Sequence, residues 1–333
     1  MELGYAISSE EHGPTQLVDF AVRAEESGFS FALVSDHYHP WLEVQGHSPF
    51  VWSVIGAIAR STERLRLGTG VTCPTIRIHP AIVAQAAATS ASMMPGRFFL
   101  GVGSGENLNE HITGARWPEA GVRLEMLEEA VEVMRLLWKG GSQSHRGRHY
   151  TVENARVYSL PQETVQVYVA AGGRRSGELA GRIGDGLIAT SPEGKHLGAF
   201  DRAGGSGKPK IAQATVCYAR DEAEAKETAA KYWPNAALRG ELTQELPLPA
   251  HFEQATGWVD GDAVAEVIVC GPDPQKHIEL LQQYQIAGFS HVYVHQVGPD
   301  QDRFFRFYQQ EVLPAFDQAK NQDGSVLAQN AVR

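Results

Sequence analysis

Titratable side chains follow several short apolar runs in this 333-residue chain, at the points where the runs end. Asp36 and His37 come directly after the run 31–35, and Glu106 follows the run 98–103. Histidine titrates near neutral pH, so His37 is suited to moving a proton to or from an alcohol or carbonyl oxygen. A carboxyl group between apolar walls can act as an acid, which makes Glu106 a second candidate. Both residues also have a structural interpretation, as a hydrogen-bonded loop histidine and as a carboxylate favoured by a helix N-terminus.

The same segment offers two further interpretations. His37, His39 and His47 could bind a metal, but a third ligand with its carboxylate partner has no obvious spacing, so the sequence predicts no metal site. Trp41 is either a wall for a planar cofactor or a core residue.

Two glycine-rich segments follow later runs. Residues 101–106 (GVGSGE) lack the third glycine of a dinucleotide-binding fingerprint, and this excludes a Rossmann interpretation. Residues 172–176 (GGRRS) precede a predicted helix, where free backbone N–H groups and two arginines favour a phosphate. A plain tight turn is the alternative for that second segment.

A scaffold must bring these side chains together, and the chain alternates apolar runs with amphipathic helical stretches. Strands covered by helices have near-continuous apolar runs, so the alternation predicts parallel strands. About eight strands favour a closed (β/α)8 TIM barrel, an α/β fold, with an open doubly wound sheet as the alternative. The expected strands are 3–8, 31–35, 65–71, 98–103, 165–172, 185–190, 210–219 and 291–295. The expected helices are 13–28, 50–61, 79–93, 119–138, 174–183, 221–232, 273–287 and 302–317.

We expect one barrel domain over residues 1–318, followed by a flexible tail at 319–333. Insertions are expected at about 140–164 and 234–262, because loops of that length in a compact domain usually have a function. In such a barrel the chemistry gathers at the carboxyl ends of the strands. The polar segments should therefore meet on one rim.

Composition narrows the classes of partner. Hydrophobic residues make up 43% of the chain and charged residues 20%, which is typical of a globular protein. A net charge of −10 provides no basic stripe for nucleic acid or an anionic membrane. Three scattered cysteines indicate a reducing cytoplasm, and neither a membrane span nor a signal peptide is expected.

Several long motifs occur in a fixed order, namely SDHYHPW (35–41), GTGVTCPTIRIHPAIVAQ (68–85), PGRFFLGVGSGENLNE (95–110) and HVYVHQVGPDQDRFFRFYQQEVLP (291–314). On these motifs the chain resembles the luciferase-like superfamily and, within it, the coenzyme F420-dependent dehydrogenases that act on glucose 6-phosphate or on secondary alcohols. The resemblance implies a TIM barrel with insertions, a homodimer, a small-molecule substrate and a deazaflavin bound over the strand ends.

Carried over by position, the resemblance implies that His37 and Glu106 are the catalytic pair, with Trp41 and Glu10 completing the pocket. It leaves open which of His37, Glu106 and Glu10 is the base. It also implies a non-proline cis peptide at Gly70–Val71, beneath the ring. The positions that match cofactor contacts are Asp36, Gly70, Val71, Cys73, Ser104, Gly105, Asn109, Gly172, Gly173, Arg175, Ser176 and Thr190.

One departure from the family concerns the substrate. The glucose-6-phosphate enzymes hold the phosphate with two lysines and an arginine, and the corresponding positions here are Glu193, Gln254 and about Glu266, although Lys195 is near the first. Loss of one charged contact costs ~2–5 kcal/mol, so we predict that glucose 6-phosphate is not the substrate. Four aromatic residues suggest a neutral, more apolar molecule, unless they belong to the core: Tyr218, Trp233, Phe252 and Trp258.

The resulting hypothesis is hydride transfer between a neutral secondary alcohol and C5 of the deazaflavin, in either direction. The alternatives are an FMN-dependent monooxygenase or reductase of the same superfamily, an F420-dependent sugar-phosphate dehydrogenase, and a non-catalytic relative that binds the cofactor.

Overall fold

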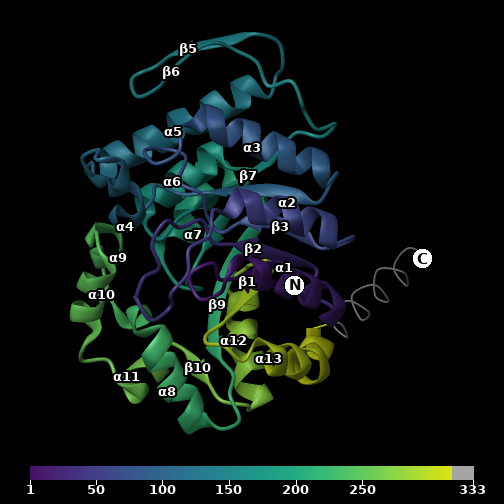
Figure 1. The fold of residues 1–333 in the computed structure, drawn as a ribbon, viewed down its shortest axis with the longest axis vertical. Coiled ribbons are helices and arrows are strands. Elements are labelled where there is room, and N and C mark those ends of the chain that lie inside the picture. Colours follow the sequence, from purple (N-terminus) through teal and green to yellow (C-terminus); the bar gives the residue numbers. More distant parts are fainter. Residues whose placement is uncertain (317–333) are drawn as a thin grey trace.

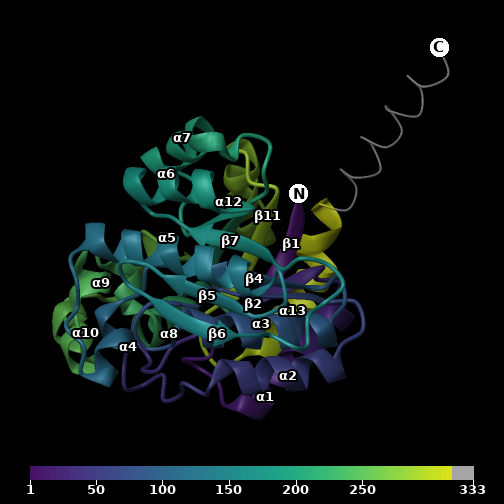
Figure 2. The ribbon, with the colours of Figure 1, turned by 90° about the horizontal axis from the view of Figure 1, so that it is seen from above.

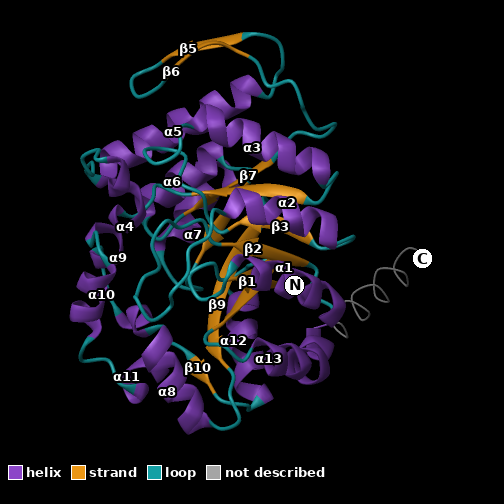
Figure 3. Ribbon diagram, in the orientation of Figure 1, coloured by secondary structure: helices purple, strands orange, loops and turns teal. Residues whose placement is uncertain are grey.

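Eight parallel strands close into a barrel in the computed structural model, which describes residues 1–316 (Figures 1 and 3). Each strand pairs with its neighbour, and the last strand pairs with the first, so the closed barrel is confirmed and the open sheet is wrong. In order around the barrel the strands are β1 (Glu2–Ile7), β2 (Phe31–Val34), β3 (Arg66–Thr69), β4 (Phe98–Val102), β7 (Gln166–Ala170), β8 (Gly186–Ala189), β9 (Lys210–Cys217) and β11 (His291–Gln296).

Helices cover the outer face of the strands. Figure 2 shows α1, α2 and α3 on one side of the strands and α6, α7 and α12 on the other. The main helices are α1 (Pro14–Ser27), α2 (Val51–Ser61), α3 (Pro80–Met93), α5 (Ala120–Leu137), α6 (Arg174–Ile183), α7 (Lys195–Phe200), α8 (Glu222–Tyr232), α12 (Pro274–Ile286) and α13 (Gln301–Phe307). No helix among the described residues is long and apolar enough to cross a membrane.

Local signals explain why most predicted helix ends agree with the structure. Asp221 and Asp273 precede α8 and α12, and their carboxylates accept hydrogen bonds from backbone N–H groups of the first turn. Gly28 ends α1 with a φ of 98°, which glycine adopts without strain. The short helix α7 was not predicted.

Large side chains fill the interior of the barrel. The interior cluster consists of Ala6, Phe31, Leu33, Phe99, Ile188, Ile211 and Tyr293, with Val71 and Tyr168 packed against it. Glycines on neighbouring strands make room for these rings, since a Cβ at Gly68 would lie 2.1 Å from Phe99. Because the interior is packed, it leaves no space for a ligand inside the barrel, and this favours the rim as the binding site.

Residues 140–164, expected to be a long insertion, contain an antiparallel hairpin of β5 (Gln143–Arg146) and β6 (Thr151–Ala155). Figure 1 shows the hairpin beyond α5, at the top of the view. Glu129 of α5 holds it there, because its carboxylate accepts the backbone N–H groups of Arg148, His149 and Tyr150. The prediction missed both strands because the hairpin is mostly polar.

Residues 234–262, here named the second insertion, contain the short helices η3 (Pro234–Ala237), α9 (Leu242–Glu245) and α10 (Pro249–Thr256), and α11 (Gly261–Ala265) begins at their end. Figure 1 shows α9 beside α4 (Asn107–Glu110). Phe252 of α10 packs in a small apolar cluster with Leu42, in the loop after β2, and Leu108 of α4. A short strand, β10 (Val269–Cys270), then pairs with the end of β9. The predicted flexible tail at 319–333 lies outside the described residues.

His277 of α12 makes the stability of the fold depend on pH. Its side chain is fully buried, with Nδ1 3.0 Å from the Tyr308 hydroxyl and Nε2 3.0 Å from the Gly271 carbonyl oxygen. Burial lowers the pKa of His277 from its ordinary value of 6.5. The fold therefore favours the neutral ring, and its contribution to stability is lost as the pH falls below about 6.5 through the lowered pKa.

We expect the free energy of unfolding to decrease between pH 7.5 and pH 5, by about 1.4 kcal/mol for each unit by which the pKa is lowered. Denaturant unfolding at a series of pH values measures this. The His277→Gln variant should be less stable at neutral pH but should show a shallower slope, with buried His12 and His196 accounting for the remainder. An unchanged slope would exclude His277 as a source of the pH dependence.

Candidate active site

The predicted site residues follow the carboxyl ends of six strands. In a closed parallel barrel these ends lie on one rim, so the structure brings the segments together. Glu10 follows β1, and Asp36, His37 and Trp41 follow β2. The other segments are 70–73 after β3, 104–109 after β4, 172–176 after β7 and Thr190 after β8.

His37 is paired with a buried carboxylate. Its Nδ1 lies 3.1 Å from Oε1 of Glu10, and the His37 and Glu10 side chains are 9% and 3% exposed. The two atoms are close enough for an ion pair, but the geometry does not meet that of a hydrogen bond. The other Glu10 oxygen accepts hydrogen bonds from the hydroxyls of Ser35 (2.6 Å) and Ser8 (3.1 Å). Glu10 is therefore held firmly on the Nδ1 side of the imidazole.

Trp41 shields the imidazole. Its ring centroid is 5.1 Å from that of His37, and on another side it is 5.1 Å from the ring of Phe252. Trp41 is half-buried and Phe252 is fully buried. The second insertion thus supports Trp41, which in turn contacts the predicted catalytic histidine.

Glu106 stands at the N-cap of the one-turn helix α4. Its Oε2 accepts a hydrogen bond from the side-chain amide of Asn109, at 3.3 Å. The amide oxygen of Asn109 accepts the backbone N–H groups of Tyr38 (2.8 Å) and His39 (3.1 Å). Asn109 was expected to contact the cofactor, but its side chain joins the loop after β2 to α4 and is almost fully buried.

The Asp36 carboxylate, also expected at the cofactor, is bonded within the protein. It accepts hydrogen bonds from the Thr72 hydroxyl (2.7 Å) and the Arg77 guanidinium (2.9 Å), and it is 3% exposed. The Asp36 carboxylate therefore joins the segment after β2 to the loop after β3.

A bed of small residues lies between the ends of β3 and β4. The Gly70–Val71 peptide is cis, as predicted. A Cβ at Gly103 would lie 2.7 Å from Val71, and a Cβ at Gly105, whose φ is 81°, would lie 2.6 Å from the Cys73 sulfur. The Val71 and Cys73 side chains occupy the space that a Cβ would need at Gly103 and Gly105, so the segments after β3 and β4 pack this closely only with glycine at these positions. Burial raises the pKa of the Cys73 thiol, which therefore stays protonated.

The far end of the rim offers donors for an anion. Gly173 caps the ten-residue helix α6, where its N–H is bonded to the Ser176 hydroxyl, and space is open around the Cα of Gly172. Arg175 is exposed in the first turn and forms no ion pair within residues 1–316. The first-turn N–H groups and Arg175 fit a phosphate. Thr190 is also exposed, and Ser104 is half-buried.

Of the histidines considered for a metal, His39 has another partner, since its Nδ1 lies 2.8 Å from the Leu108 carbonyl oxygen. For His47 the backbone N–H, not the ring, donates to the Glu10 carbonyl oxygen. The part of the chain that the structure describes contains no group of three histidine, cysteine or carboxylate side chains able to hold a metal ion.

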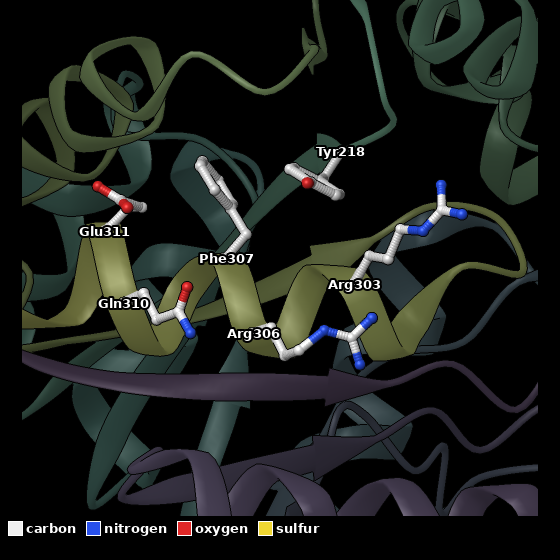
Figure 4. A pocket seen from close by; sticks show the side chains of 6 residues that line it. All are labelled: Tyr218, Arg303, Arg306, Phe307, Gln310 and Glu311. Carbon is white, nitrogen blue, oxygen red and sulfur yellow. The ribbon is translucent and has the colours of Figure 1, made fainter.

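The structure separates the four aromatic residues expected near the substrate. Phe252 is a core residue that packs against the Trp41 ring. The ring centroids of Trp233 and His295 are 4.3 Å apart. Trp258 is 65% exposed. Tyr218 stacks on Phe307 of α13 and lines a hollow of about 300 Å³ with residues of α13 and of the helical turn 308–312, shown in Figure 4.

Several residues at the rim were missed. Arg77 and Glu110 form a buried network with Asp36. Glu11 Oε2 lies 2.8 Å from His295 Nε2, and both of these side chains are 2% exposed. Glu11 directly follows Glu10, and His295 lies near the end of β11, so strand-end position was an available signal for this pair. No local pattern marks Arg77.

The amino-acid sequence is similar to those of known proteins. The family model described as luciferase-like monooxygenase matches residues 1–291. The F420-dependent glucose-6-phosphate dehydrogenase of Nocardia farcinica is 38% identical over 328 residues, covering 94% of this chain and 97% of the relative. The enzyme of the same name from Microbacterium testaceum is 37% identical over 326 residues, with the same two coverages.

A solved structure is also similar. It is an F420-dependent secondary alcohol dehydrogenase in complex with an F420–acetone adduct, with a TM-score of 0.86 and 29% identity, and the match covers 93% of this chain and 98% of that one. The chain therefore belongs to the luciferase-like superfamily and, within it, to the coenzyme F420-dependent dehydrogenase family.

Proposed function

We propose that this protein is an F420-dependent dehydrogenase that acts on a neutral secondary alcohol, or on the corresponding ketone in reverse. The observation that carries the proposal is the His37–Glu10 pair, which lies on the same rim as Glu106 and the glycine-lined bed. The similar enzymes named above are F420-dependent, and the structure of one of them was solved in complex with an F420–acetone adduct.

The residues present fit a deazaflavin. Gly103, Gly105 and the cis peptide at Gly70–Val71 would lie beneath the ring, where the two glycines add no side chain of their own. The start of α6, with Arg175, would hold the phosphate of the tail. When bound, the deazaflavin supplies a two-electron acceptor that takes hydride at C5.

The chain's own residues handle the proton. In alcohol oxidation His37 takes the hydroxyl proton at Nε2, since Nδ1 faces Glu10. The Glu10 carboxylate stabilises the imidazolium that forms, and the two serine hydroxyls keep Glu10 in place. Trp41 excludes water from one side of the imidazole, and the Glu106 carboxyl group lies at the start of α4, just after the end of β4.

The charge of the rim supports a neutral substrate. Glu193 after β8, Gln254 on α10 and Glu266 after α11 are all exposed, and none of the three carries a positive charge to pair with a phosphate dianion. Lys195, the nearby cation, is exposed at the start of α7.

We expect kcat/KM for glucose 6-phosphate to be lower than for a neutral alcohol by about 30-fold to several thousand-fold, the equivalent of one lost charged contact. Steady-state kinetics with both substrates measures this ratio. The Glu193→Lys, Gln254→Lys double variant should bring the two kcat/KM values closer together. Glu227→Lys on α8 is the control, because it makes a similar charge change on another helix and should leave the ratio unchanged. Equal turnover of the sugar phosphate by the unaltered protein would contradict the charge argument.

The proposed function is tested by anaerobic titration of the purified protein with oxidised F420 and a panel of neutral alcohols, followed by loss of the deazaflavin absorbance. Turnover of at least one neutral alcohol is expected. Binding of FMN in preference to F420, with oxygen uptake in the presence of NAD(P)H, would overturn the proposal in favour of a monooxygenase.

A further inference from the structure

Arg77, in the loop between β3 and α3, is a buried guanidinium that no step described above uses. Its side chain is 7% exposed. Its Nη2 donates to both the carboxylate (2.9 Å) and the backbone carbonyl (3.0 Å) of Asp36. On the other side its backbone N–H donates to Glu110 Oε2 at 2.7 Å, and its Nε lies 3.5 Å from Glu110 Oε1.

The two partners of Arg77 belong to the segments that carry the predicted catalytic residues. Asp36 directly precedes His37. Glu110 ends α4, the helix that Glu106 caps. One side chain from the β3 loop therefore contacts both the segment after β2 and the segment after β4. The Asn109 side chain makes a second link between the same two segments.

General stabilisation does not explain this arrangement well. Burying an ion pair costs desolvation, and such pairs are often no more stable than apolar replacements of similar volume. Burial alone would lower the pKa of Arg77, yet the Asp36 carboxylate raises it above its ordinary value, so the side chain stays charged. The planar guanidinium also provides donors in fixed directions, which a lysine cannot reproduce.

We infer that Arg77 is a positioning residue that fixes the segments of His37 and Glu106 relative to each other, and thereby the geometry of proton transfer. The inference rests on the proposed function for its catalytic consequence. The charged and titratable groups that face Arg77 are Asp36, Glu110 and Cys73. None of these is a group to which a reaction step has been assigned.

The test compares Arg77→Ala and Arg77→Lys with Arg97→Ala. Arg97 is a matched control, because its guanidinium also bridges separate segments, donating to the Thr62 and Leu65 carbonyl oxygens, but it lies just before β4, at the amino end of the strand. Glu110→Gln is a milder variant that keeps the shape of the network if Arg77→Ala does not fold.

Arg77→Ala is expected to lower kcat by about 10²-fold, the order of loss that a small misplacement of catalytic groups causes, with little change in KM. Millimolar guanidinium ion should restore part of this activity, and Arg77→Lys should not. The pH profile of kcat should shift in Arg77→Ala and Glu110→Gln. Arg97→Ala should lower thermal stability only. Guanidinium ion should not raise its activity, and its pH profile of kcat should not shift.

Hydrogen exchange of the protein without cofactor provides a readout independent of turnover. Arg77→Ala should speed exchange in both 35–41 and 104–111, whereas Arg97→Ala should not. A kcat loss no larger than that of Arg97→Ala, without rescue, or faster exchange in neither segment, would overturn the inference. If the unaltered protein turns over no alcohol, the proposed function fails by itself, and exchange still decides whether Arg77 holds both segments.

Discussion

Replacement of His37 by alanine is expected to lower kcat for alcohol oxidation by about 10²–10⁴-fold, the usual contribution of a general base. The hydroxyl proton would have to leave to water, from a position that Trp41 shields. Binding of F420 should change little, because the residues proposed to hold the ring and phosphate lie after β3, β4 and β7. Stopped-flow absorbance of the deazaflavin measures the chemical step, and equilibrium titration measures binding.

A second imidazole–carboxylate pair provides the control for this prediction. His145 of the hairpin lies 3.0 Å from Glu129 of α5, so His145→Ala removes similar chemistry outside the site. The kcat of His145→Ala should equal that of the unaltered protein. The kcat of Glu10→Gln should lie between those of His37→Ala and His145→Ala, because this variant keeps the serine contacts but removes the charge beside Nδ1. Unchanged turnover in His37→Ala would mean that Glu106 or Glu10, and not His37, takes the hydroxyl proton.

The largest expected effect on stability comes from Phe252→Ala. Phe252 is fully buried and touches Trp41, Leu42 and Leu108, so its removal leaves a cavity between the second insertion and the rim. Truncation of a buried phenylalanine costs about 3–5 kcal/mol. The loss of stability should be concentrated in the second insertion and should appear as faster hydrogen exchange over residues 234–262. The KM should rise, because Trp41 loses its support.

Trp258→Ala is the matched control for Phe252→Ala. This residue is also aromatic and lies in the second insertion, but it is 65% exposed. Its replacement should change stability by no more than about 0.5 kcal/mol. Comparable losses in the two variants would show that the packing of Phe252 is not what holds the insertion on the rim.

Short-range patterns determined most of the scaffold. Each of the eight apolar runs became a barrel strand, because a strand covered by helices on its outer face must be apolar on both faces. Helix ends agreed closely with the prediction where a local cap was present, as at Asp221, Asp273 and Gly28. The rim placement of His37 and Glu106 followed from parallel strand direction alone.

The prediction was weaker where contacts join distant parts of the chain. The polar hairpin of β5 and β6 has little apolar periodicity, and its position depends on Glu129 in a neighbouring helix. Phe252 and Trp258 are six residues apart and both aromatic, yet one is core and the other exposed. No local pattern distinguishes them, since burial depends on what packs above each ring.

The sequence by itself determined the barrel, the rim and the family resemblance, because strand periodicity, helix caps and motif order are all local along the chain. Only the tertiary structure decided that Glu10 faces His37, that Asn109 and Asp36 are bonded within the protein, and that Arg77 joins the segments of His37 and Glu106. These contacts depend on the angles at which loops leave different strands. Such angles are set by packing across the whole barrel, which no stretch of sequence specifies alone.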